Sequence, residues 1–419
     1  MPVSLYVHIP FCLKRCIYCD FVSGIYDSEK ADAYIKALKN EISGIPSTTQ
    51  FSTLYIGGGT PTALSTHTLS DLIKHIFFHF NFSPLHPPPG KGGQAGYEAT
   101  IEANPGTVDF EKLHALRLAG INRISIGIQS FNDDELAFLG RVHTAEEAEH
   151  AVSLARDAGF ENIGIDLIYG IPGQTQFTWR QTLENAVRLR PKHISTYELT
   201  VNKGTLLHEY LEVHPHPVPP PSRGRVCESD FSRFPSPCGR GSRGGGYRFT
   251  LPEEEQIIRM YEYTIDYLTS KNYIHYEISN FALPDYLCKH NLNYWDRGEY
   301  YGAGLGAHSF IDHKRFYNTG DPEFYINALT ENKSPVQETE QITEDKAIAE
   351  TFFLGLRKTG GINLKTISES YKQDLARLYQ NEIKELEEAG LIEYNSRSFN
   401  LKLTRKGLLL SNEVFTRFM

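Results

Sequence analysis

The sequence predicts an α/β fold: a partial parallel (β/α)6 barrel followed by a C-terminal helical, winged-helix-like domain. Two observations support this prediction. Short runs of β-branched and apolar residues alternate with helical patterns through the first half of the 419-residue chain, and after Pro335 the pattern changes to helices followed by two strands. Alternating strands and helices require a parallel sheet with right-handed crossovers. Six such units are too few to close a standard eight-stranded barrel.

The alternation gives six strands and five helices. The strands are expected at 5–9, 53–56, 99–101, 123–128, 163–168 and 193–199. The helices are expected at 29–43, 69–80, 110–118, 145–158 and 178–189. In barrels of this kind the chemistry gathers at the carboxyl ends of the strands. The residues that follow each strand are therefore the candidates for a functional site.

The first strand leads into Cys12, Cys16 and Cys19, which have the spacing C-x3-C-x2-C. Three thiolates in one loop, without a fourth, would hold a [4Fe-4S] cluster and leave one iron open to a small molecule. Structural zinc with His8 as fourth ligand is an alternative, but His8 lies in a strand-like run and zinc knuckles usually pair ligands as C-x2-C. A disulfide suits neither the odd number nor a cytosolic chain. The spacing favours the cluster and leaves zinc or inert thiols open.

Glycines and polar residues follow the next four strands. They lie in the segments 57–61, 102–105, 125–130 with 140–143, and 166–173. In the triple glycine 57–59, backbone amides can approach a ligand closely. Each segment has an ordinary explanation as a turn or a helix cap. Because they follow successive strands, we expect them to meet at one rim and form a ligand site.

Together these motifs resemble the radical S-adenosylmethionine superfamily, in which such a cysteine loop holds a [4Fe-4S] cluster that chelates S-adenosylmethionine. More narrowly, the chain resembles the oxygen-independent coproporphyrinogen III oxidase branch through the segments 6–12, 57–61, 102–105, 127–130, 140–143 and 166–170. The resemblance implies that Cys12, Cys16 and Cys19 ligate the cluster. It implies that the S-adenosylmethionine site is lined by Tyr6, Gly58, Gly59, Thr60, Glu102, Gln129, Arg141 and Asp166.

Three features separate two functions within this branch. Phe21 stands where the oxidase carries a fourth cysteine, and the extension that precedes the first strand of the oxidase is missing. The segments 290–295 and 301–309 resemble the family of haem chaperones called HemW. This resemblance implies a protein that binds haem and delivers it to acceptor proteins, without coproporphyrinogen oxidase activity. The alternative is an oxygen-independent coproporphyrinogen III dehydrogenase that makes protoporphyrinogen IX by radical decarboxylation.

A haem needs an axial donor and a flat apolar slot, and the segment 276–310 supplies candidates for both. His290 is the candidate axial ligand, with His308 and Cys288 as further donors. The aromatic candidates are Tyr294, Trp295, Tyr300, Tyr301 and Phe310. Packing between domains would also explain these aromatic residues.

The chain divides into four expected parts. They are a barrel over 1–212 with a low-complexity insert at 83–96, a low-complexity and disordered insert over 213–249, a barrel extension with the haem-contact segment over 250–335, and the winged-helix-like domain over 336–419. The insert 213–249 holds six arginines and two acidic residues, which suits a solvated linker or contact with an acidic partner or lipid headgroups. Cys227 and Cys238 within it are expected to be free thiols.

Charge and hydropathy limit the partners. The formal net charge is −9, and the segment 343–419 holds twelve Lys and Arg against eleven Asp and Glu, so no nucleic-acid binding is expected. No run of 18 apolar residues predicts a transmembrane segment, while peripheral membrane contact stays open. The early first strand leaves no room for a signal peptide, so we expect a cytoplasmic protein. The expected partners are haem, a haem-accepting protein and an electron donor.

Overall fold

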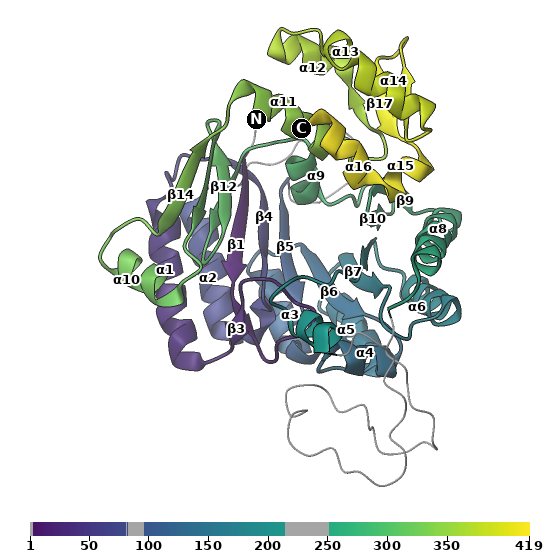
Figure 1. The fold of residues 1–419 in the computed structure, drawn as a ribbon. Helices are drawn as coiled ribbons and strands as arrows, with labels where there is room; N and C mark the ends of the chain where they lie inside the picture. The colour runs from purple at the N-terminus through teal and green to yellow at the C-terminus, as the bar shows by residue number, and fades with distance from the viewer. Residues whose placement is uncertain (1–2, 81, 83–95, 214–250) are drawn as a thin grey trace.

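A 12-stranded sheet forms the centre of the molecule (Figure 1). The computed structural model describes residues 3–80, 82, 96–213 and 251–419. The two expected inserts therefore lie outside the described residues, apart from Gly96 and Val213. The order of the strands is β14-β13-β12-β11-β1-β4-β5-β6-β7-β8-β10-β9.

The middle of this sheet is the parallel array that the sequence predicts. Its strands are β1 (Val3–Ile9), β4 (Phe51–Gly58), β5 (Glu98–Ala103), β6 (Arg123–Gln129), β7 (Asn162–Tyr169) and β8 (His193–Glu198). Each pairs in parallel with the next along the chain. The predicted α/β class with a parallel sheet is therefore confirmed. All carboxyl ends of these strands meet at the same edge of the sheet.

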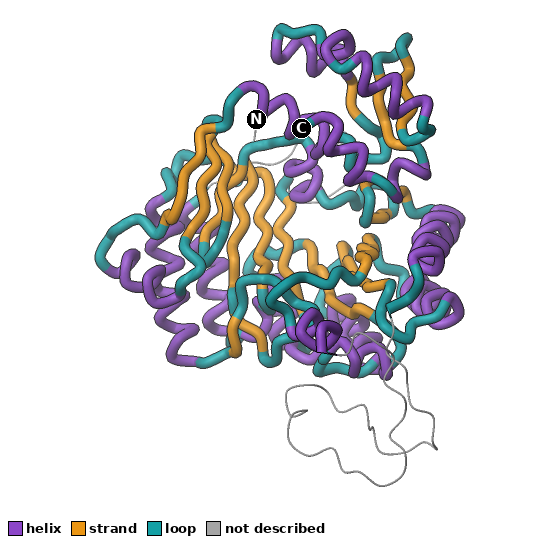
Figure 2. Tube along the Cα trace, viewed as in Figure 1, coloured by secondary structure: helices purple, strands orange, loops and turns teal. Residues whose placement is uncertain are grey.

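Helices follow these strands and form a layer outside the sheet, as the purple and orange tubes in Figure 2 show. They are α1 (Ser28–Gly44), α2 (Thr66–His79), α3 (Phe110–Leu118), α5 (Ala145–Asp157) and α6 (Gln176–Arg188). Each begins after a side chain that accepts a hydrogen bond from the backbone N–H three residues later; these caps are Asp27, Ser65, Asp109, Thr144 and Thr175. The caps fix where each strand-to-helix loop ends.

Residues beyond the barrel extend the sheet at both edges. On one side β11 (Tyr300–Ala303) pairs in parallel with β1, and the antiparallel strands β12 (His308–Ile311), β13 (Lys314–Asn318) and β14 (Val336–Gln341) follow. On the other side lie β10 (Asn280–Ala282) and β9 (Ile274–Glu277). The remaining helices of the barrel part are α4 (Asp133–Leu139), α7 (Leu206–Val213), α8 (Glu254–Ser270), α9 (Lys289–Trp295) and α10 (Pro322–Thr330).

The C-terminal unit combines helices with a small sheet of order β15-β17-β16. Its elements are α11 (Glu344–Gly355), β15 (Ile362–Asn363), α12 (Leu364–Tyr371), α13 (Leu375–Leu378), α14 (Gln380–Glu388), β16 (Ile392–Asn395), β17 (Asn400–Leu403), α15 (Arg405–Leu409) and α16 (Ser411–Phe415). The helices α13 and α14 meet at Tyr379, whose ring packs 4.8 Å from that of Phe352 and 5.5 Å from that of Phe418. No helix in the described ranges is long and apolar enough to cross a bilayer.

Candidate functional site

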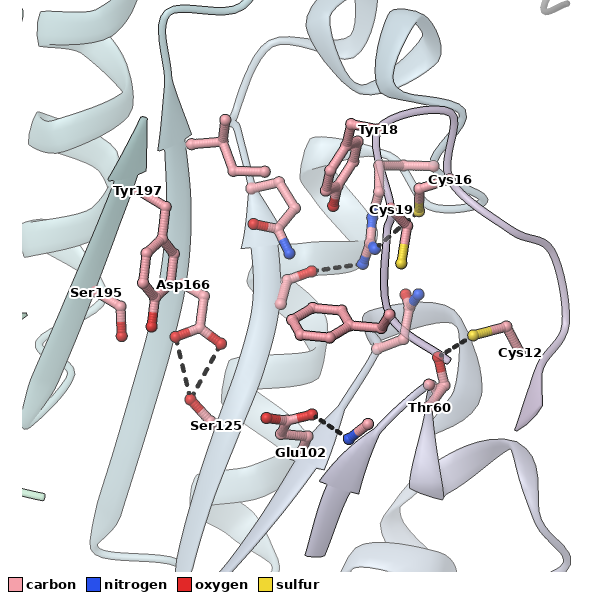
Figure 3. A pocket seen from close by; sticks show the side chains of 18 of the residues that line it. Cys12, Cys16, Tyr18, Cys19, Thr60, Glu102, Ser125, Asp166, Ser195 and Tyr197 are labelled. Carbon is pink, nitrogen blue, oxygen red and sulfur yellow. Dashed lines mark hydrogen bonds between the residues drawn. The ribbon is translucent and has the colours of Figure 1, made fainter. Parts of the chain in front are cut away.

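A pocket of about 390 Å³ lies at the carboxyl ends of the parallel strands (Figure 3). It brings together most of the predicted site residues, namely Cys12, Cys16, Cys19, Gly58, Gly59, Thr60, Glu102, Gln129, Arg141 and Asp166. We call it the cluster pocket. The three cysteines lie on one side of it, and Asp166, Ser195 and Tyr197 lie on the opposite side (Figure 3).

The cysteine loop starts in β2 (Phe11–Cys12), which pairs with β3 (Gly24–Ile25). All three cysteines are free thiols. Thr60 Oγ1 donates to Cys12 Sγ over 3.5 Å, and Arg141 Nη1 donates to Cys16 Sγ over 3.4 Å. Burial raises the pKa of Cys12 and Cys19, so both thiols stay protonated at neutral pH until a metal displaces the proton. The donors to sulfur suit bound thiolates.

The donor set fits a cluster better than a single ion. Among the described residues, no three His, Cys, Asp or Glu side chains converge closely enough to hold one metal ion. Zinc needs four donors around one point, whereas each thiolate of a [4Fe-4S] cluster binds its own iron. His8 is also occupied, since its Nδ1 lies 3.0 Å from Tyr6 Oη and its Nε2 2.8 Å from the Val22 carbonyl oxygen.

The triple glycine packs the end of β4 against the cysteine loop. A Cβ on Gly59 would lie 2.8 Å from the Phe11 carbonyl oxygen and 3.1 Å from Cys12 Sγ. Gly58 has φ +115°, which other residues rarely adopt. The N–H groups of Gly58, Gly59 and Thr60 donate to Glu102, to the Ile9 carbonyl and to the Phe11 carbonyl, respectively. The protein itself therefore takes up these three donors, while the backbone of Gly58 and Gly59 still lines the cluster pocket.

Two carboxylates face the cluster pocket from β5 and β7, the strands on either side of β6. Glu102 accepts hydrogen bonds from Gly58 N (3.0 Å) and Tyr55 Oη (2.8 Å), and burial raises its pKa to about 7. Asp166 accepts from Ser125 Oγ at 3.2 and 3.1 Å, and burial raises its pKa as well. Both carboxylates retain lone pairs for the hydroxyl or ammonium groups of a ligand.

Gln129, at the end of β6, and Arg141, after α4, also line the cluster pocket. Gln129 has φ +71° at an irregularity in the pairing of β6 with β7, an uncommon conformation that is typical of functional sites. Arg141 Nη2 donates to the Gly127 carbonyl over 2.7 Å. Since Arg141 also donates to Cys16, it ties the end of β6 to the cluster loop.

Several lining residues were not predicted from the sequence. They include Tyr18, Tyr55, Arg123, His193, Ser195, Tyr197 and Asn202. A signal for some of them was present, because positions 193, 195 and 197 alternate along β8 and positions 123, 125, 127 and 129 alternate along β6. Alternate residues of a strand share one face. The alternation of polar side chains along β6 and β8 could therefore have identified these pocket residues from the sequence.

Two predicted site residues lie outside the cluster pocket. Tyr6 lines a second pocket, and its ring stacks on that of Tyr55 with the centroids 6.2 Å apart. His290 is buried, with its Nδ1 2.8 Å from Thr53 Oγ1 and its Nε2 2.9 Å from Tyr294 Oη. Burial lowers the pKa of His290 to about 3. An iron could reach this imidazole only after one of its two hydrogen bonds breaks.

Two family models and several curated relatives match this chain. Residues 6–186 match the model of the Radical SAM superfamily, and residues 342–410 match that of the HemN C-terminal domain. The heme chaperone HemW of Bacillus subtilis (strain 168) is 37% identical over 419 residues, covering 99% of both chains. The chain belongs to the radical SAM superfamily, in the HemN-like branch that includes HemW. The superfamily implies a [4Fe-4S] cluster and S-adenosylmethionine.

Other relatives agree with this membership. The heme chaperone HemW of Lactococcus lactis subsp. lactis (strain IL1403) is 35% identical over 418 residues, covering 100% of this chain and 97% of the relative. The solved structure of coproporphyrinogen III oxidase (HemN) from Escherichia coli has a TM-score of 0.79 at 24% identity, covering 100% of this chain and 90% of that one. The fold of the radical SAM chain described above is therefore that of HemN.

Proposed function

We propose that this radical SAM protein is a haem chaperone that binds haem and delivers it to an acceptor protein, without oxidising coproporphyrinogen. Cys12, Cys16 and Cys19 hold the cluster in this proposal. S-adenosylmethionine lies against Gly58, Gly59, Thr60, Glu102, Gln129, Arg141 and Asp166. The ring of Tyr6 supports that of Tyr55, which lines the same pocket. The support from relatives is that two of them, matched over 97% or more of their length, are named heme chaperones.

One observation carries the proposal. Phe21, two residues after Cys19, is 62% exposed and lines the cluster pocket. The resemblance to the oxidase implies a fourth cysteine at this position, and a phenyl ring can neither ligate a metal nor donate a proton. The cluster pocket, at about 390 Å³, is also near the lower end of the range of about 300–1,000 Å³ that is usual for ligand sites. It suits one nucleotide-sized ligand better than a nucleotide together with a tetrapyrrole.

The chain's own residues would prepare this site. A reduced cluster supplies one-electron cleavage of S-adenosylmethionine when both are bound. Thr60 and Arg141 stabilise two of the thiolates by donating to sulfur, and Glu102 and Asp166 accept from the ligand's donors.

A paired assay tests the function. The protein is reconstituted anaerobically with iron and sulfide, then titrated with haem and, in parallel, incubated with coproporphyrinogen III, S-adenosylmethionine and a reductant. We expect stoichiometric haem binding and no protoporphyrinogen, with E. coli HemN as the positive control for turnover. Haem transfer is measured by mixing the loaded protein with haem-depleted respiratory membranes. Formation of protoporphyrinogen IX would overturn the proposal in favour of the oxidase.

A further inference from the structure

A second pocket, of about 550 Å³, lies beside the cluster pocket. Its walls are mainly aromatic and come from the cysteine loop, α9, β11, β12 and α11; they include Phe21, Tyr294, Trp295, Tyr300, Phe310 and Phe353. We call it the aromatic pocket. The stacked rings of Tyr6 and Tyr55 separate the two pockets, because Tyr6 lines the aromatic pocket and Tyr55 the cluster pocket.

The shape and chemistry of these walls suit a flat apolar ligand. Tyr294 and Tyr300 meet edge to face at 4.7 Å, and the ring of Phe310 lies 6.5 Å from that of Tyr300. Phe21 and Val22 at the tip of the cysteine loop are 62% and 40% exposed. A large apolar ligand in the aromatic pocket would cover these exposed side chains.

Positive charge lines one wall of the aromatic pocket. Arg297 Nε donates to Glu350 Oε2 over 2.8 Å, and Arg315 Nη1 donates to Glu350 Oε1 over 2.6 Å, so two guanidinium groups share one carboxylate. Both lie over the ring of Phe310, at 4.6 and 5.5 Å from its centroid. Arg297 is about nine-tenths buried, and neither its Nη2 nor Trp295 Nε1 has a hydrogen-bond partner within the described parts of the chain. This wall has donors and one net positive charge available for a carboxylate.

Three histidines are candidate donors to an iron: His8 and His308 line the aromatic pocket, and His290 contacts Tyr294 in its wall. His8 and His290 each have both ring nitrogens in hydrogen bonds. His308 differs, because it lines the aromatic pocket, is exposed, and has no hydrogen bond to either ring nitrogen among the described residues. Its ring is oriented by stacking on Tyr317, with the centroids 4.9 Å apart and the planes 25° from parallel. Burial, and then the charge of Arg315, lower the pKa of His308, so its imidazole is neutral at pH 7.

We propose that haem binds in the aromatic pocket, with His308 as an axial ligand of the iron and Arg315 and Arg297 paired with the propionates. This inference rests on the proposed haem-binding function and assigns it a site. In this site His290 is a positioning residue, since its Nε2 holds the hydroxyl of Tyr294 in the wall. Phe353 and Leu354 of α11 close the pocket from the C-terminal unit, so release of haem is coupled to the contact between α11 and the barrel.

The test uses the full chain with its cluster reconstituted and follows ferric haem binding in the Soret region. His308→Asn should weaken haem binding about tenfold or more and change the Soret maximum. His313→Asn, in the same hairpin and exposed but outside the pocket, is the matched control and should bind haem as the unaltered protein does. Iron-free protoporphyrin IX should bind the His308→Asn variant normally, which shows that the pocket is still folded.

A second variant tests the propionate contact independently. Haem dimethyl ester lacks the carboxylates and should bind the unaltered protein more weakly than haem does, while Arg315→Gln should reduce this difference. If both His308→Asn and Arg315→Gln keep the affinity and spectrum of the unaltered protein, the aromatic pocket is not the haem site, although the proposed function survives. If the unaltered protein itself binds no haem, both the function and this site are overturned.

Discussion

The cluster pocket and the aromatic pocket lie on either side of one pair of tyrosine rings, yet they are built differently. The cluster pocket collects charged side chains, including Glu102, Arg141 and Asp166, from the ends of successive parallel strands. The aromatic pocket collects rings from four separate parts of the chain and has only two charged residues, Arg297 and Arg315, in its wall. The first suits a polar nucleotide next to a metal cluster, and the second suits a flat apolar ligand with few charges.

With haem in the proposed site, this difference would let one barrel hold two ligands without one excluding the other. The pockets have separate walls except at Phe21, which lines both. Phe21 follows the cysteine loop directly, and Val22 next to it accepts a hydrogen bond at its carbonyl from His8. Any coupling between cluster and haem should therefore pass through the tip of this loop.

The largest expected effect separates the pockets by removing the cluster. Replacing Cys12, Cys16 and Cys19 by Ala should abolish bound iron and sulfide, because no thiolate remains in the loop. Haem affinity should stay within about twofold, since none of the three cysteines lines the aromatic pocket and distant sites couple by less than ~0.5 kcal/mol. Iron analysis and haem titration measure the two results.

Cys288→Ala is the control for the cysteine variant. Cys288 is buried, and its Sγ lies 3.6 Å from Glu98 Oε1, far from the cysteine loop in the sequence and outside both pockets. The Cys288→Ala variant should keep its bound iron and sulfide. A loss of haem affinity in the triple variant alone would show that the two pockets act as one site, with Phe21 as the connection.

The next largest expected effect concerns the charged side chains that distinguish the cluster pocket from the aromatic pocket. Glu102→Gln should weaken S-adenosylmethionine binding by about 10–100-fold, because a charged acceptor becomes neutral. Since the pKa of Glu102 is raised to about 7, the unaltered protein should also lose affinity as the pH falls from 8 to 6. The variant should lack this pH dependence, and haem affinity should not change. The affinity for S-adenosylmethionine is measured at equilibrium at several pH values. If the affinities of the two proteins depend on pH in the same way, the role of Glu102 is contradicted.

The same carboxyl group makes a prediction for stability. Its folded pKa of about 7 is above the ordinary value of 4.5, so ionisation costs stability progressively as the pH rises from about 4.5 to 7. Glu102→Gln removes this cost. As the pH rises from 5 to 8, the free energy of unfolding of the variant should therefore increase by about 1–3 kcal/mol relative to that of the unaltered apoprotein. Urea unfolding at pH 5 and pH 8 measures the free energy of unfolding of both proteins. If the variant differs from the unaltered protein by the same amount at the two pH values, Glu102 has an ordinary pKa.

A smaller effect distinguishes positioning from ligation in the aromatic pocket. His290→Ala should weaken haem binding about three- to tenfold and leave the brown cluster spectrum intact, because Tyr294 loses the partner that holds its hydroxyl. Tyr294→Phe breaks the same hydrogen bond and should have a similar effect. If His290 were the iron ligand, only His290→Ala would change the Soret spectrum, so the pair of variants decides between the two roles.

The sequence predicted the cluster pocket far better than the aromatic one, for a physical reason. Carboxyl ends of parallel strands meet at one edge whatever the loops do, so residues next to a strand, such as Glu102 and Asp166, could be placed from the chain order alone. The aromatic pocket depends on β11 joining β1 and on α11 packing nearby, which are long-range contacts without a local signal. For the same reason the sequence alone does not separate His290 from His308, since burial of one and exposure of the other follow from tertiary packing.

The smallest expected effect tests whether the cluster pocket tunes its cluster through single hydrogen bonds. Thr60 Oγ1 donates to Cys12 Sγ over 3.5 Å, and donors to sulfur stabilise the more negative, reduced cluster. Thr60→Val should therefore lower the cluster potential by about 40 mV, which corresponds to about 1 kcal/mol for one electron. A redox titration followed by electron paramagnetic resonance measures the shift.

Thr62→Val is the matched control, because Thr62 is also buried but bonds to Thr107 Oγ1 at 2.6 Å instead of to sulfur. Its cluster potential should stay that of the unaltered protein. Equal shifts in the two variants would mean that general loosening of the segment after β4, and not the bond to Cys12, sets the potential. Haem affinity should be unaffected in both, because neither threonine lines the aromatic pocket, and a change there would contradict the separation of the two pockets.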